Sequence, residues 1–112
     1  MLNIKKGENA LIKRFLKKKD KTDFNRTEFT TMSVDLVQNG VTIQSYAFPD
    51  SYLRAGTALN EIELEISTTV SSKFKGGKVV AYYTFVVPDA DLEDSAYTII
   101  VDEELLDVEN VP

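Results

Sequence analysis

The side chains of this chain that could perform chemistry are amines, carboxylates and hydroxyls, because it contains neither histidine nor cysteine. Without histidine it lacks the commonest general base and the commonest metal ligand. Without cysteine it has no thiol nucleophile, no disulfide and no thiolate ligand for zinc. Serines and carboxylates are present, but no pair has the spacing of a nucleophile and its base. We therefore expect a protein that is not an enzyme and carries no cofactor.

One acidic cluster has the residue types of a calcium site. Asp89, Asp91, Glu93 and Asp94 supply closely spaced carboxylates, and calcium prefers oxygen ligands. The order departs from a helix–loop–helix calcium loop, since no glycine occupies its sixth place and Ile100 occupies its twelfth. We expect a solvated turn here and no metal site.

The charges are unevenly distributed along the chain. Residues 1–26 carry nine lysines and arginines against three acidic residues, whereas the rest carries four against fifteen. The candidate contact residues are Lys13, Arg14, Lys17, Lys18, Lys19 and Lys21 on the basic side, and Glu61, Glu63 and Glu65 on the acidic side. An overall pI near 4.7 argues against nucleic acid as a partner. The basic stretch is then either a solvated edge that discourages unwanted pairing, or an arm that lies on the acidic face or tail of a neighbouring copy.

Aromatic side chains suggest a second kind of site. Tyr46, Phe48, Tyr52, Tyr82 and Tyr83 could form a platform for a sugar ring, so a small carbohydrate-binding module is the alternative function. In a chain rich in strands the same side chains are ordinary core material. We favour the core.

The elements that position these side chains are predicted to be strands, organised around residues 59–87. Ile62, Leu64 and Ile66 alternate with the three glutamates, which is typical of a half-buried strand. Residues 79–87 are apolar on both faces and rich in β-branched and aromatic side chains, which predicts a central or fully covered strand.

A hairpin is the strongest local prediction. Asn39-Gly40 separates residues 29–38, in which Met32, Val34 and Leu36 share one face, from an alternating run over 41–48. Asn-Gly favours a type I′ turn, because both central residues need a positive φ.

The patterns near the two ends of the chain each allow two interpretations. Residues 10–16 fit a strand or an amphipathic helix, and we favour the strand because the following elements are strands. Residues 97–101 predict a last short strand, and residues 102–109 are acidic enough that we expect them to fray or to dock elsewhere.

This pattern predicts an all-β fold: one antiparallel β-sandwich of six or seven strands with immunoglobulin-like architecture and no convincing helix. We divide the chain into a basic N-terminal arm or edge strand (1–26), a sandwich body (27–101) and an acidic C-terminal tail (102–112).

Three segments carry a resemblance to a known class: Ile4-Lys5-Lys6-Gly7-Glu8-Asn9, Leu53-Arg54-Ala55-Gly56-Thr57 and Phe85-Val86-Val87-Pro88-Asp89-Ala90. They resemble small β-sandwich modules of tailed-bacteriophage structural proteins, namely capsid-decorating proteins and adaptor modules of baseplates and fibres. The resemblance implies a non-enzymatic virion protein whose partners are other copies of itself or other virion proteins. Because the chain stops after one domain, we expect a standalone component rather than an adaptor.

The apolar runs of the sequence also indicate where the protein is expected to be located. No apolar run is long enough to span a bilayer, and the first residues lack the apolar core of a secretion signal. We expect no membrane contact, and a location in the virion or otherwise in the cytoplasm.

Overall fold

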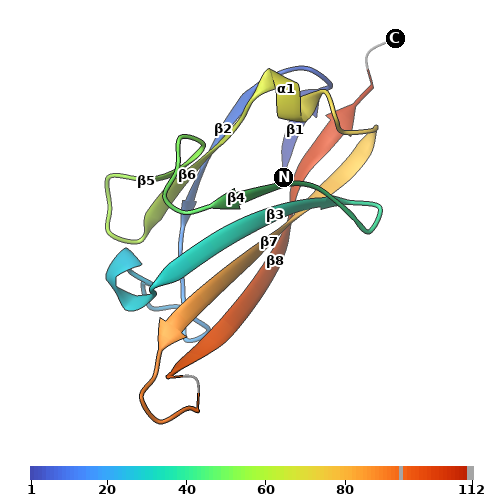
Figure 1. The fold of residues 1–112 in the computed structure, drawn as a ribbon. Helices are drawn as coiled ribbons and strands as arrows, with labels where there is room; N and C mark the ends of the chain where they lie inside the picture. The colour runs from blue at the N-terminus through green and yellow to red at the C-terminus, as the bar shows by residue number, and fades with distance from the viewer. Residues whose placement is uncertain (94, 111–112) are drawn as a thin grey trace.

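A computed structural model describes residues 1–93 and 95–110 of the chain (Figure 1). The strands are β1 (Leu2–Lys5), β2 (Ala10–Phe15), β3 (Thr31–Gln38), β4 (Val41–Ala47), β5 (Leu53–Ala55), β6 (Glu61–Ile66), β7 (Gly77–Pro88) and β8 (Ala96–Glu109). A 3₁₀ turn, Arg26–Glu28, precedes β3, and a single turn of helix, α1 (Thr68–Ser71), joins β6 to β7. The described residues therefore form strands and the segments that connect them, with two short helical turns among the connections.

The strands form two sheets. The larger has the order β1-β8-β7-β3-β4 and the smaller has the order β2-β6-β5. Neighbouring strands are antiparallel except for β1, which runs parallel to β8. The all-β prediction is confirmed. The finer prediction of an antiparallel sandwich with six or seven strands differs from the structure, because one pair is parallel and the described residues hold eight strands.

The core lies between the inner faces of the two sheets. Ile62 and Leu64 from β6 join Leu36 from β3 and Val79 from β7 in one cluster of side chains that are at most 2% exposed. The period of two in β6 places its apolar side chains inward, as predicted. β7 is a central strand, as predicted, because it pairs with β3 on one edge and β8 on the other.

Two local predictions are confirmed by the backbone. Asn39 and Gly40 form the two-residue turn between β3 and β4, with φ angles of 54° and 77°. Residues 10–15 are a strand and not a helix, because β2 pairs with β6 over its whole length. Its side chains alternate, with Ile12 buried and Leu11 exposed.

The last strand does not end at Val101. β8 continues to Glu109, and Leu105, Leu106 and Val108 are all buried. The register shifts so that Val79 pairs with Leu106 and Val80 pairs with Glu104, which leaves Leu105 as the extra residue of a β-bulge. The bulge allows two consecutive leucines to enter the core. The segment expected to be an acidic tail is therefore half of a strand through Glu109.

The basic N-terminal segment is also part of the two sheets. β1 pairs with the C-terminal end of β8 in the large sheet, while β2 forms an edge of the small sheet. Ile4 and Ile12 from these strands belong to the core. Figure 1 shows β1 beside the C-terminal end of β8 and β2 in the other layer.

Tyr46 on β4 leads to a prediction about stability. Its side chain is buried, and its hydroxyl has no hydrogen-bond partner among the described residues. Because an unpaired buried polar group is destabilising, Tyr46→Phe should leave the free energy of unfolding unchanged or raise it by about 1 kcal/mol. Urea denaturation at neutral pH measures this difference. A loss of stability in the variant would show that the hydroxyl has a favourable partner.

The same residue should make stability sensitive to alkali. Burial, with a smaller effect of the Asp50 charge, raises the pKa of Tyr46 to about 12. Below pH 10 the hydroxyl is protonated in both states, whereas above it the unfolded chain ionises first. Stability should therefore fall as the pH rises from about 10 to about 12. Tyr46→Phe should reduce this fall, measured as the difference between the two proteins in unfolding free energy across that range.

Candidate interaction surface

A groove runs along the side of the molecule between the end of β2 and the first half of β8. We call it the β2–β8 groove. Its volume is about 830 Å³, and it is lined by residues 17–19, 24, 27–28, 85, 87–88 and 97–101. A smaller hollow of about 140 Å³ shares part of this lining and extends it toward Arg14 and Glu103. The groove thus lies between strands of both sheets.

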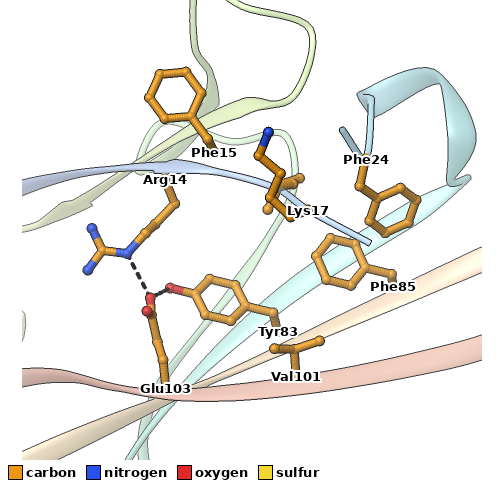
Figure 2. A pocket seen from close by; sticks show the side chains of 9 residues that line it. Arg14, Phe15, Lys17, Phe24, Tyr83, Phe85, Val101 and Glu103 are labelled. Atoms are coloured by element: carbon orange, nitrogen blue, oxygen red, sulfur yellow. Dashed lines mark hydrogen bonds and ion pairs between the residues drawn. The ribbon is translucent and has the colours of Figure 1, made fainter. Parts of the chain in front are cut away.

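The floor of the groove is aromatic. The rings of Phe24 and Phe85 have centroids 5.0 Å apart, and Phe29 packs edge-on against both, at 5.3 Å and 5.2 Å. Phe24 and Phe85 lie next to Lys17 in Figure 2. Phe24 and Phe85 line the groove, and because all three rings are buried and packed against one another, these two form a fixed apolar base.

A polar cluster ties the two sheets together at one end of the groove (Figure 2). Arg14 of β2 donates from Nε to Oε1 of Glu103 on β8 at 2.9 Å, and the Tyr83 hydroxyl of β7 donates to the same oxygen. Burial, followed by the hydrogen bond to Glu103, holds the pKa of Tyr83 well above its ordinary value. The tyrosine therefore acts as a hydrogen-bond donor and not as a base. The cluster therefore joins β2 of the small sheet to β7 and β8 of the large sheet.

Large apolar side chains gather around the groove with much of their surface in solvent. Tyr97, Ile100 and Val101 line the groove and are 41%, 64% and 48% exposed, and Phe15, which lines the adjoining hollow, is 59% exposed. Contiguous exposed apolar surface with a polar rim marks contact sites in proteins.

The outer edge of β8 beside the groove is unpaired over most of its length. β7 pairs with β8 from Ala96 to Val108, but β1 covers the other edge only from Leu106 to Glu109. In the described part of the chain no strand pairs with the remaining stretch. We call residues 96–104 the β8 free edge.

The structure brings some of the predicted basic residues to this groove. Lys17, Lys18 and Lys19 line it, and Arg14 lines the adjoining hollow. Lys17 pairs with Asp23 and Lys18 with Glu28. The hydrogen bond of the second pair raises the pKa of Lys18 and lowers the pKa of Glu28.

The other two predicted basic residues lie away from the groove lining. Lys13 pairs with Glu63 of β6 at 3.8 Å, on the small sheet. Lys21 occupies a turn with a φ of 68° between β2 and the 3₁₀ turn. Both are exposed.

The three predicted acidic residues do not form one open face. Glu61 is buried, and its Oε1 accepts hydrogen bonds from the backbone N–H of Thr57 at 2.6 Å and of Ala58 at 3.4 Å. Glu63 pairs with Lys13 of β2, and Glu65 pairs with Arg54 of β5 at 2.9 Å. The complementarity expected between copies therefore exists here within one chain, between neighbouring strands.

The aromatic residues expected for a sugar platform are not brought together. Tyr46 and Tyr83 are buried in the core, and Phe48 packs against it. Tyr52 precedes β5 of the small sheet and Tyr82 lies on β7 of the large sheet. No aromatic platform is formed by these five.

The acidic turn that follows β7 is organised by a hydrogen bond of its own. Asp89 accepts a hydrogen bond from the backbone N–H of Asp91 at 3.0 Å, which organises the turn, while Asp94 lies outside the described residues. Within residues 1–93 and 95–110 there is no group of three or more acidic side chains placed to hold a metal ion.

In the same residues no helix has the length and apolarity needed to cross a membrane.

Sequence reasoning missed the apolar half of this surface. Residues 97–101 were predicted as a strand, but the fact that one edge stays unpaired depends on where β1 binds. Phe15 gave a usable signal, because in a strand it faces away from Ile12.

The fold and the surface together define an all-β, sandwich-like protein with an apolar, lysine-rimmed groove at an open sheet edge. A scan against protein-family models, a search of curated proteins and a search of solved structures each found no match.

Proposed function

We propose that this chain is a non-enzymatic structural or assembly protein that acts through protein–protein contacts, with the β2–β8 groove and the β8 free edge as its contact surface. The observation that carries the proposal is the concentration of exposed apolar side chains at an unpaired strand edge. An apolar centre within a polar rim is the usual anatomy of a protein interface. Here the rim is formed by Lys17, Lys18 and Lys19.

The architecture within the all-β class is part of the proposal. The order β8-β7-β3-β4 corresponds to strands G-F-C-C′ of an immunoglobulin-like sandwich, and β2-β6-β5 corresponds to B-E-D. The parallel strand β1 then lies beside the G position. This correspondence supports an immunoglobulin-like module.

A virion location is proposed on the resemblance of the three segments 4–9, 53–57 and 85–90 to phage structural modules. One of them meets the surface described here, because Phe85 is in the floor of the groove. The first segment includes the end of β1, which pairs with Val108 and Glu109 beyond the β8 free edge. The partners would be copies of this chain or other virion proteins.

The proposal is tested by measuring association in solution. We expect an assembly, followed by light scattering, that weakens as salt rises from about 0.05 M to about 1 M, because the lysine rim is screened over a few ångströms at the higher value. Phe15→Ser should weaken association by about tenfold or more. Phe15 lines the hollow that adjoins the groove. Leu11→Ser is the matched control, since Leu11 is 50% exposed on the same strand but lines neither the groove nor the hollow.

If the purified chain does not associate with itself, the immobilised wild type and its Phe15→Ser variant are compared for capture of partner proteins. Retention by the wild type and loss in the variant would support a foreign partner at this surface. Equal behaviour of Phe15→Ser and Leu11→Ser in both experiments would contradict the proposal.

A further inference from the structure

We propose that the occupant of the β8 free edge is the same edge of a second copy of this chain, paired antiparallel about a two-fold axis at Ile100. The inference rests on the proposed assembly function and specifies the partner and the register. It joins the two five-stranded sheets into one continuous ten-stranded sheet.

The other sheet edges carry the protections that proteins normally give an exposed edge, which are shortness, charge or a bulge. β1 and β5 have only 4 and 3 residues, and β2 carries Lys13 and Arg14. β4 contains a bulge where its register with β3 shifts.

In the described residues the β8 free edge has none of these protections over residues 97–101. That stretch reads Tyr-Thr-Ile-Ile-Val, without charge, proline or glycine. Such a strand invites pairing with another strand.

The extent of the open stretch fixes the register of the pairing. β1 covers β8 from Leu106 onward, so the open stretch is 96–104 and its midpoint is Ile100. Pairing about this midpoint uses the whole open stretch without displacing β1. Ile100 then faces its own copy, Ile99 faces Val101, and Thr98 faces Asp102 of the other chain. Apolar β-branched residues oppose one another and no two like charges are opposed, which is the favourable arrangement for cross-strand pairs.

The two ends of the β8 free edge differ in charge. Lys17, Lys18 and Lys19 flank the Tyr97 end of the edge, because all of them line the groove with it. Asp102, Glu103 and Glu104 form the other end. Glu103 is held by Arg14 and Glu104 pairs with Lys78 at 3.4 Å, so Asp102 is the carboxylate of this end that forms no ion pair within the described residues. Antiparallel pairing about Ile100 places the basic end of each chain beside the acidic end of its partner. Because of the two-fold symmetry, this attraction between a basic end and an acidic end occurs twice in the dimer, and it favours the antiparallel orientation of the two strands.

The predicted register is tested by cysteine cross-linking, which suits a chain with no native cysteine. Opposed residues of antiparallel strands have Cα atoms about 4.5–5.5 Å apart, within the range of a disulfide. Ile100→Cys should therefore form a covalent dimer under mild oxidation. Thr98→Cys is the matched control: its two copies would be about 13 Å apart along the strands, too far to bridge. The double variant Thr98→Cys/Asp102→Cys should cross-link again.

A second measurement tests whether association depends on the β8 free edge. Ile100→Lys places two like charges opposite each other and should weaken association about 100-fold or more. Val41→Lys changes a side chain of similar exposure, 59%, on the opposite edge strand and should leave association unchanged. Circular dichroism of both variants verifies that they are folded.

The outcomes separate this inference from the proposed function. Equal cross-linking of Ile100→Cys and Thr98→Cys, or an assembly unaffected by Ile100→Lys, would overturn the β8 pairing while leaving an assembly protein. A wild type that is monomeric at every salt concentration, or that forms only polydisperse aggregates, would also overturn it. The proposed function would then be decided by the Phe15 experiment alone.

Discussion

Replacement of Leu106 by alanine should lower the free energy of unfolding by about 2–5 kcal/mol. Leu106 is 0% exposed and lies where three strands meet, opposite Val79 of β7 and Leu2 of β1. The smaller side chain leaves a cavity that strands fixed on both sides cannot close. Because small domains are stable by only about 5–15 kcal/mol, the variant should lose a large fraction of its stability. Urea denaturation followed by circular dichroism measures the effect.

Leu2→Ala is the matched control for this prediction. It removes the same atoms from a leucine directly opposite Leu106, but Leu2 is 41% exposed. Its cost should be below about 1 kcal/mol, as for most surface substitutions. If Leu106→Ala cost as little as Leu2→Ala, the second half of β8 would behave as the frayed acidic tail that its composition suggests.

The parts of the fold that sequence predicts here are those fixed by local chemistry. Asn39-Gly40 accepts positive φ at both positions, so the hairpin depends on two residues and their flanking strands. The alternation in β6 likewise needs only the period of two to place Ile62 and Leu64 inward.

The parts that sequence did not predict depend on residues far apart in the chain. The bulge at Leu105 breaks the period of two, so a run of acids around two adjacent leucines resembles a solvated tail. The parallel pairing of Leu2 with Leu106 joins the two ends of the chain, and no local pattern encodes it. The β8 free edge follows from where that pairing stops.

The candidate site was predicted in part for the same reason. Charge counting located the lysines that line the groove, because charge is a local property of sequence. Charge counting could not distinguish Glu61 from Glu63 and Glu65, because all three lie on the same side of the strand. Of the three, the loop before β6 covers Glu61. Burial by a loop is a tertiary effect.

Among the three glutamates of β6, only Glu61 should contribute strongly to folding. Glu61 is 8% exposed, and Glu61→Ala removes the carboxylate that accepts from the Thr57 and Ala58 N–H groups, so we expect a cost of about 2–3 kcal/mol. Glu63→Ala and Glu65→Ala break only partly exposed ion pairs and should each cost less than about 1 kcal/mol. Thermal and urea unfolding of the three variants measures the contrast.

A double-mutant cycle with Gly56 tests whether Glu61 acts as a clamp on its loop. A methyl group at Gly56 would lie 2.3 Å from Cγ of Glu61, and the three nearest atoms all belong to that side chain. Gly56→Ala should therefore destabilise the wild type by about 1–3 kcal/mol but cost almost nothing when residue 61 is alanine. Additive costs would mean that the loop is held instead by Arg26, whose Nη1 donates to the Glu61 carbonyl at 2.7 Å. Strong coupling would mean that the Glu61 carboxylate is engaged inside its own chain, packed against Gly56 and bonded to the N–H groups of Thr57 and Ala58.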